Sequence, residues 1–236
     1  MVEKVIKRAK DFSAQWGKYI MQYKDVIHWR AKDKTIILIS HSQERPMNGV
    51  ELKLSAPIDR QIDALAHNIK KFPIVNRSKK REEEHKQQAK FIFDLMQNKS
   101  SSAIQAIKSH LNAEDVVFAG SEVVLYEGSG VFHTEHKQIM DVVLVSPSKK
   151  RIYVVEMKKL KPSKNKNMSP EEQVNGYIQT YGKKERLAAL REIISCYSGV
   201  NVTEEYSLEG IVLQGYSSNE VPNVLKNGKF ITFCFS

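Results

Sequence analysis

Two short apolar runs separated by a polar break mark the most informative stretch of the chain, residues 138–161. The runs VVLV and IYVV flank the polar segment SPSKKR, and β-branched residues in such runs are typical of strands. The pattern therefore predicts a β-hairpin of two half-buried strands joined by a short loop. Side chains alternate between the two faces of a strand, so Glu156 and Lys158 are expected to point the same way.

Two acidic residues interrupt these apolar strands. The register that pairs Val145 with Ile152 across the loop also places the two acids, Asp141 and Glu156, opposite each other. Their Cβ atoms would then lie about 4.5–5.5 Å apart, and a slip of two residues would instead set Asp141 opposite Lys158 on the same face. An unpaired buried carboxylate is costly, whereas two at this spacing can share one hard cation through their oxygens. The pattern thus indicates a cation site with Lys158 at its edge.

The remaining pattern of apolar positions predicts further helices and strands. Helices are expected at residues 2–29, 57–72, 83–97 and 103–111, and strands at residues 34–40, 116–128, 210–216 and 229–235. Ser169, Pro170 and Glu172 form a capping box with proline in the first turn, which starts another helix that breaks near Gly182. Helix, strands with a hairpin, helix and strand in this order indicate an α/β (α+β) fold around a small central mixed sheet.

Charge is distributed unevenly along the chain, and a boundary is expected near residue 80. Residues 1–80 read as a basic, mostly helical N-terminal region with one strand, and residues 81–236 as a second domain. Residues 1–82 hold 18 Lys and Arg against 9 Asp and Glu, and the span from Lys149 to Lys166 holds eight basic residues and one acid. Basic patches suit a polyanion such as nucleic acid, although an ordinary solvated surface has the same composition.

Several classes of protein are disfavoured by what the sequence lacks. It has no run of about 18 apolar residues, so no membrane span is expected. The N-terminal segment MVEKVIKRAKDF is charged throughout and has no apolar core of a signal peptide. Cys196 and Cys234 are too few for a disulfide framework or a cysteine-rich zinc site. We therefore expect an intracellular protein, cytoplasmic or nuclear, that makes no membrane contact.

The helix after the hairpin carries Gln173 and Tyr177, which are four residues apart and so share one helix face. Asp141, then Glu156-Met157-Lys158 on the next strand, then this Gln-xxx-Tyr element together resemble the PD-(D/E)XK nuclease superfamily. The Gln-xxx-Tyr element is similar to that of its RecB-like branch. The resemblance covers residues 100–216 and leaves residues 1–80 outside. It implies a restriction-endonuclease-like core with helices on both sides of a mixed sheet.

This resemblance implies hydrolysis of phosphodiester bonds in nucleic acid with Mg²⁺ or Mn²⁺ as cofactor, and we expect DNA as the preferred substrate, with RNA as the alternative. Asp141 and Glu156 would bind the metal, and the carbonyl of Met157 would complete its shell. The acid that some members carry on an upstream helix is replaced here, in Ser-Ala-Ile-Gln, by Gln105. Glu84, in the run of three glutamates that starts the earlier helix, is the alternative source of that acid.

The resemblance also implies roles for residues that do not bind the metal. Lys158 would orient or activate the attacking water and offset charge in the transition state. Gln173 and Tyr177 would brace the site or touch the nucleic-acid backbone. A lysine-rich loop after the hairpin is expected to contact phosphates through Lys159, Lys161, Lys164 and Lys166.

Two other functions remain open at this point. A protein with the nuclease fold that binds nucleic acid without cleaving it would explain the missing helix acid. An interaction module, in which the basic N-terminal region docks an acidic protein partner, would explain the charge distribution.

Overall fold

The computed structural model describes residues 14, 27–32, 35–40, 49–53, 79–96, 101–123, 126–127, 130–131, 140–160, 169–228 and 230–236. Before the hairpin these form β1 (Ile27–Lys32), β2 (Thr35–Ser40), β3 (Gly49–Lys53), α3 (Lys79–Met96), α4 (Ser102–Leu111), β4 (Val117–Val123), β5 (Tyr126–Glu127) and β6 (Gly130–Val131). From the hairpin onward they form β7 (Met140–Ser146), β8 (Arg151–Lys158), α5 (Pro170–Tyr181), α6 (Lys184–Ser198), β9 (Ser207–Gln214), β10 (Asn223–Asn227) and β11 (Phe230–Cys234).

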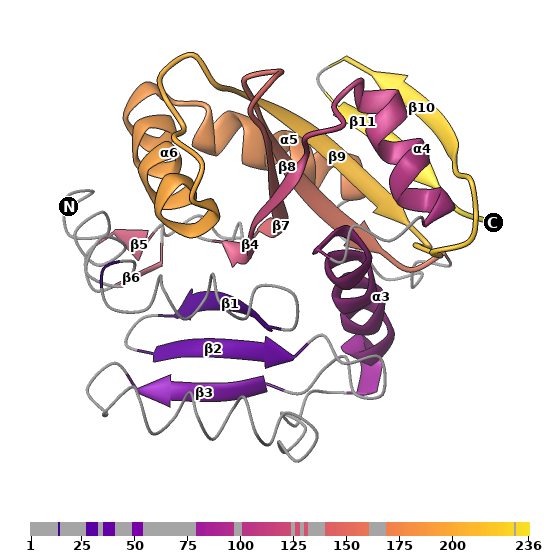
Figure 1. Cartoon of the computed structure of the whole chain (residues 1–236), viewed down its shortest axis with the longest axis horizontal. Helices are drawn as coiled ribbons and strands as arrows, with labels where there is room; N and C mark the ends of the chain where they lie inside the picture. The colour runs from indigo at the N-terminus through magenta and orange to yellow at the C-terminus, as the bar shows by residue number, and fades with distance from the viewer. Residues whose placement is uncertain are drawn as a thin grey trace.

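The largest of the sheets that these elements form is mixed and six-stranded, in the order β10-β11-β9-β8-β7-β4 (Figure 1). Strands β4, β7 and β8 pair antiparallel, β8, β9 and β11 run parallel, and β10 returns antiparallel at the edge. Helices flank the sheet, so the predicted α/β class is confirmed. No helix within the described residues combines the length and apolar character needed to cross a membrane.

Both strands of the hairpin are buried on both faces. Val143 and Val154 belong to an apolar cluster with residues of α5 and α6, whereas Val142 and Val155 belong to a second cluster with residues of α3 and α4. The prediction of half-buried strands was therefore wrong. Strands covered by helices on both faces carry near-continuous apolar runs, which accounts for VVLV and IYVV.

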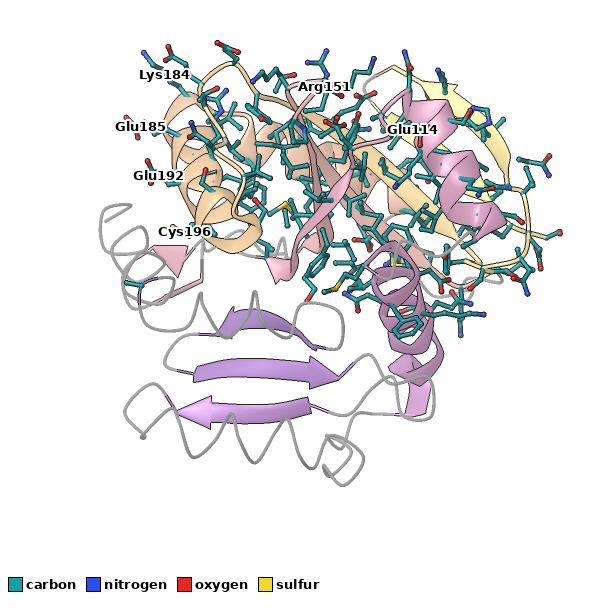
Figure 2. The ribbon with its side chains drawn as sticks, in the orientation of Figure 1. Glu114, Arg151, Lys184, Glu185, Glu192 and Cys196 are labelled. Atoms are coloured by element: carbon teal, nitrogen blue, oxygen red, sulfur yellow. The ribbon has the colours of Figure 1, made fainter. Side chains whose placement is uncertain are left out.

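Helix α5 is fixed against the sheet by its cap and by one glycine. The predicted capping box is present, because Ser169 accepts from the N–H of Glu172 while the Glu172 carboxylate accepts from the N–H of Ser169. The predicted break near Gly182 separates α5 from α6. A β-carbon at Gly210 would lie 2.1 Å from Cγ1 of Val174, so only glycine lets α5 pack this closely on β9. The outer face of α6 carries charged residues such as Glu185 (Figure 2).

Two parts of the sheet pattern differ from the sequence prediction. The edge strand β10 was missed, because its residues are mostly exposed and show no apolar alternation. In the N-terminal region one strand was predicted, but β1, β2 and β3 form a three-stranded antiparallel sheet. The helix expected at residues 57–72 lies outside the described residues. Of the helix expected at residues 2–29, the structure describes Ala14, which is helical, and residues 27–29, which belong to β1, so the predicted helix extended too far. Helix α3 begins at Lys79, beside the predicted boundary.

The tight end of the hairpin is held by an acid from outside it. The Asp115 carboxylate accepts hydrogen bonds from Ser146 Oγ at 2.7 Å, from Ser148 N–H at 2.6 Å and from Ser148 Oγ at 2.8 Å. Burial works to raise the pKa of Asp115, but the hydrogen bonds from Ser146 and Ser148 outweigh it and lower the pKa overall. The turn is therefore stabilised by the ionised form of this acid.

We expect Asp115→Ala to lower the free energy of unfolding at pH 7 by about 1.5–3 kcal/mol, the range for hydrogen bonds to a charged group. Because the folded-state pKa is depressed, this stabilisation is present above the unfolded-state pKa and is lost as pH falls through the folded-state value. Urea unfolding at pH 7 and pH 3 measures both effects. Glu114→Ala, at the exposed neighbouring position, is the matched control and is expected to change little (Figure 2).

Candidate active site

The two acids of the hairpin meet at its open end. The structure pairs Val145 with Ile152 and Val142 with Val155, which is the register predicted from the sequence. Asp141 follows one residue beyond the last of these pairs, and by the same register it lies opposite Glu156. The tight end of the hairpin lies at Arg151, at the edge of the molecule away from α3 (Figure 2).

Asp141 makes two hydrogen bonds where the β7–β8 ladder stops. Its Oδ2 accepts from the backbone N–H of Met157 at 2.8 Å. Its backbone carbonyl accepts from Nε2 of Gln88, on α3, at 2.6 Å. The carboxylate thus takes the place of a ladder partner for Met157, and its main chain is tied to a helix on another part of the chain.

Glu156 is a buried carboxylate with both oxygens engaged. Glu156 is 2% exposed, and Lys158 is 8% exposed. Lys158 Nζ forms an ion pair and hydrogen bond with Oε1 of Glu156. Tyr177, on α5, donates its hydroxyl to Oε2 of Glu156 at 2.6 Å. A buried charge is tolerable only when it is paired and hydrogen-bonded, and both conditions are met here.

The electrostatics of the site follow from burial and from these contacts. Burial and the neighbouring charge of Glu156 raise the pKa of Asp141 to about 8. Burial works to lower the pKa of Lys158, but the charges of Glu156 and Asp141 raise it overall. Burial and the charge of Glu156 raise the pKa of Tyr177 as well, so its hydroxyl remains a hydrogen-bond donor. Near neutral pH the site therefore holds a charged lysine and an acid that resists ionisation.

Of the two positions considered for an upstream acid, Glu84 and not Gln105 is the one whose charge acts on Asp141 and Lys158. Gln105 is exposed on α4, so the place where a glutamate was sought does not face the site. Glu84 is partly buried on α3, and its charge is among the causes that raise the pKa of Lys158, after those of Glu156 and Asp141. The same charge adds to the effects of burial and Glu156 in raising the pKa of Asp141.

The donor set fits a hard cation, though not a complete protein cage. Within the described part of the chain, no three His, Cys, Asp or Glu side chains gather as a metal-binding group. Mg²⁺ is commonly held by one or two carboxylates, with water and substrate phosphates as its other ligands. Asp141 and Glu156 supply two carboxylates at one place, and their oxygens match this preference.

Other predicted site residues are only partly tested by the structure. Gln173 lies one turn before Tyr177 on α5 and is partly buried, and no hydrogen bond joins its side chain to the acids or to Lys158. Lys159 follows β8 and is partly buried. The other three lysines of the loop, Lys161, Lys164 and Lys166, lie outside the described residues.

Gln88 is the site residue that sequence reasoning missed. It is 8% exposed, and it donates to a residue 53 positions away in the chain. The available signal was its spacing, because Gln88 lies four residues after Glu84 and therefore on the same face of α3. That signal was not used.

If Glu156 binds a metal, as the sequence resemblance implies, we expect Tyr177→Phe to lower kcat or Mg²⁺ affinity by about 10–100-fold, the usual effect of removing a hydrogen-bond partner of a metal-binding carboxylate. The ring stays in the core, so the melting temperature is expected to change little. Tyr153→Phe removes the same hydroxyl from the opposite face of β8 and is the matched control. Steady-state cleavage assays with a Mg²⁺ series measure the effect, and equal losses in the two variants would contradict the assignment.

Comparison with known proteins provides no family for this chain. No protein-family model, no curated protein and no solved structure matches it significantly.

Proposed function

We propose that this protein is a metal-dependent nuclease that hydrolyses phosphodiester bonds in nucleic acid, DNA in preference to RNA, with Mg²⁺ or Mn²⁺. The observation that carries the proposal is the meeting of Asp141, Glu156 and Lys158 at the open end of one buried hairpin. The influence of Glu84 on the same groups supports it. The order of helix, antiparallel strands, helix and parallel strand also supports the restriction-endonuclease-like core that the sequence resemblance implied.

The metal would be held by Asp141 and Glu156, and it would supply Lewis-acid stabilisation of charge on the phosphate. Tyr177 fixes the Glu156 carboxylate through its hydrogen bond to Oε2. Lys158 remains protonated and therefore offsets negative charge that develops on the phosphate oxygens. Its ammonium group also orients the attacking water by donating to it. Burial of the Lys158–Glu156 pair strengthens these interactions by excluding bulk solvent.

Cleavage of plasmid and of single-stranded oligonucleotides in the presence of Mg²⁺ or Mn²⁺ tests this function. The expected result is nicking or degradation that stops when EDTA is added. The same substrates made of RNA show whether the preference for DNA holds.

A second candidate is a nucleic-acid-binding protein that keeps this architecture without catalysis. The observation that favours it is the lack of a three-residue metal-binding group in the described part of the chain. Calorimetric titration with Mn²⁺ separates the two functions. Binding that is lost in Asp141→Asn supports the nuclease, and a wild type that binds DNA but no Mn²⁺ supports the second candidate.

A further inference from the structure

Helix α3 is tied to the rest of the domain at two polar points. At one, Gln88 donates to the backbone carbonyl of Asp141 at 2.6 Å. At the other, Asp94 accepts from the hydroxyl of Tyr216 at 2.8 Å and from Ser218 Oγ. Both Gln88 and Asp94 are buried polar residues. The second point joins α3 to the residues that follow β9, whereas the first lies on the main chain of one of the acids of the site.

The position of the Gln88 contact gives it more than a packing role. Asp141 lies beyond the last β7–β8 pair, Val142 with Val155, although β7 stays paired with β4 as far as Met140, opposite Val123. Gln88 binds this carbonyl from the helix side, while the N–H of Met157 binds the Asp141 carboxylate from the strand side. The Asp141 peptide and carboxylate are thereby held from two directions. Loss of the Gln88 donor would remove one of these two restraints and would cost about 0.5–1.5 kcal/mol, the usual net contribution of one hydrogen bond.

The same contact fixes the rotation of α3 at the turn that carries Glu84. Glu84 and Gln88 are four residues apart, so their side chains lie on one face, one above the other. The hydrogen bond of Gln88 to Asp141 therefore keeps Glu84 on the side of α3 that faces the hairpin. This agrees with the effect of the Glu84 charge on both Asp141 and Lys158.

We propose that Gln88 is a positioning residue that holds the main chain of Asp141. The Asp141 carboxylate thereby keeps the orientation in which it accepts from the N–H of Met157 and lies beside Glu156 and Glu84. This inference rests on the proposed function, because it assigns Gln88 to the geometry of the same metal-binding acids. Groups that orient metal ligands typically change metal affinity or activity by about 10–100-fold when removed.

The test compares Gln88→Met with Asp94→Asn in the full chain. Methionine matches the length of glutamine, favours helix and removes the side-chain amide that donates to Asp141. Asp94→Asn weakens the other polar point of α3 without contacting Asp141, so it controls for loss of helix docking. Three quantities are measured for each variant: Kd for Mn²⁺ by calorimetry, kcat at saturating Mn²⁺, and hydrogen exchange of the Met157 N–H in EDTA, followed in protein labelled with ¹⁵N-methionine. Melting temperature is recorded alongside.

We expect Gln88→Met to raise Kd for Mn²⁺ by about tenfold or more, to lower kcat, and to speed exchange of the Met157 N–H about tenfold relative to other core amides. Asp94→Asn is expected to lower the melting temperature while leaving Mn²⁺ affinity and Met157 exchange near wild type. Equal effects of the two variants on all three measurements, or a Gln88→Met that changes only melting temperature, would overturn the proposal. A wild type that neither binds Mn²⁺ nor cleaves DNA contradicts the proposed function, and the exchange of the Met157 N–H then still decides whether Gln88 positions Asp141.

Discussion

Asp141→Asn is expected to abolish metal-dependent cleavage, with kcat falling by on the order of a thousandfold or more. Loss of a metal-binding carboxylate removes several kcal/mol of charge stabilisation, and each 1.4 kcal/mol corresponds to about tenfold in rate. The substitution keeps the size of the side chain and an oxygen that accepts from the N–H of Met157. The effect is therefore on charge and not on packing.

Lys158→Met should give a comparable loss of kcat for a different reason. It removes the ammonium that pairs with Glu156 and that, in the proposed mechanism, offsets charge on the phosphate. Binding of DNA, measured by fluorescence anisotropy without metal, is expected to stay within a fewfold of wild type in both variants. Asp115 is an acid that holds the far end of the same hairpin, so Asp115→Asn is the matched control and should cleave as wild type does. Equal cleavage by wild type and Asp141→Asn would show that a contaminating nuclease does the cutting.

The second large effect of Asp141→Asn is on stability, which is expected to rise although cleavage is lost. We expect Asp141→Asn to raise the melting temperature of the metal-free protein at pH 8 to 9. Burial and the charge of Glu156 raise the pKa of Asp141 from 3.8 to about 8. The ionised acid therefore weakens the folded state, whereas asparagine carries no charge. Since Asp141 is only partly buried, we set the increase in the free energy of unfolding at about 3 kcal/mol. For a chain of this size, that corresponds to a rise in melting temperature of about 6–12 °C.

The pH dependence follows from the direction of the pKa change. Because the folded-state pKa lies above the unfolded-state value, the contribution of Asp141 to stability is fully present below about pH 4 and is lost as pH rises to about 8. The difference in melting temperature between wild type and Asp141→Asn should therefore increase as pH rises across this range. Differential scanning fluorimetry in EDTA from pH 5 to pH 9 measures it.

Asp115→Asn is the internal control for this measurement. The pKa of Asp115 is lowered, so its substitution should cost stability at neutral pH instead of adding it. Added Mn²⁺ should stabilise wild type by mass action and leave Asp141→Asn unchanged. The difference in melting temperature between the two proteins should then become smaller. A difference in melting temperature that stays constant with pH would show that Asp141 is ionised in both the folded and the unfolded state throughout. It would contradict the expected coupling to Glu156.

The local part of the site was predictable from the sequence, and the long-range part was not. Two apolar runs rich in β-branched residues and a short polar loop between them were enough to predict the hairpin and the Val145–Ile152 register. The capping box of α5 was equally local. In contrast, half-burial of the strands was a wrong prediction, because alternation within one strand does not show how many helices cover the sheet. The edge strand β10 was missed because its exposed residues make no pattern.

By itself, the sequence determined that two acids and a lysine share one face at one end of a hairpin, because strand periodicity and turn length are local properties of the chain. Tertiary structure decided which groups surround them. Tyr177 meets Glu156 across 21 positions, and Gln88 meets Asp141 across 53 positions. Such contacts depend on how apolar faces from distant segments pack, as where Gly210 lets α5 approach β9. The same packing buried Glu156 and Lys158 and brought Glu84 within electrostatic range of both Asp141 and Lys158.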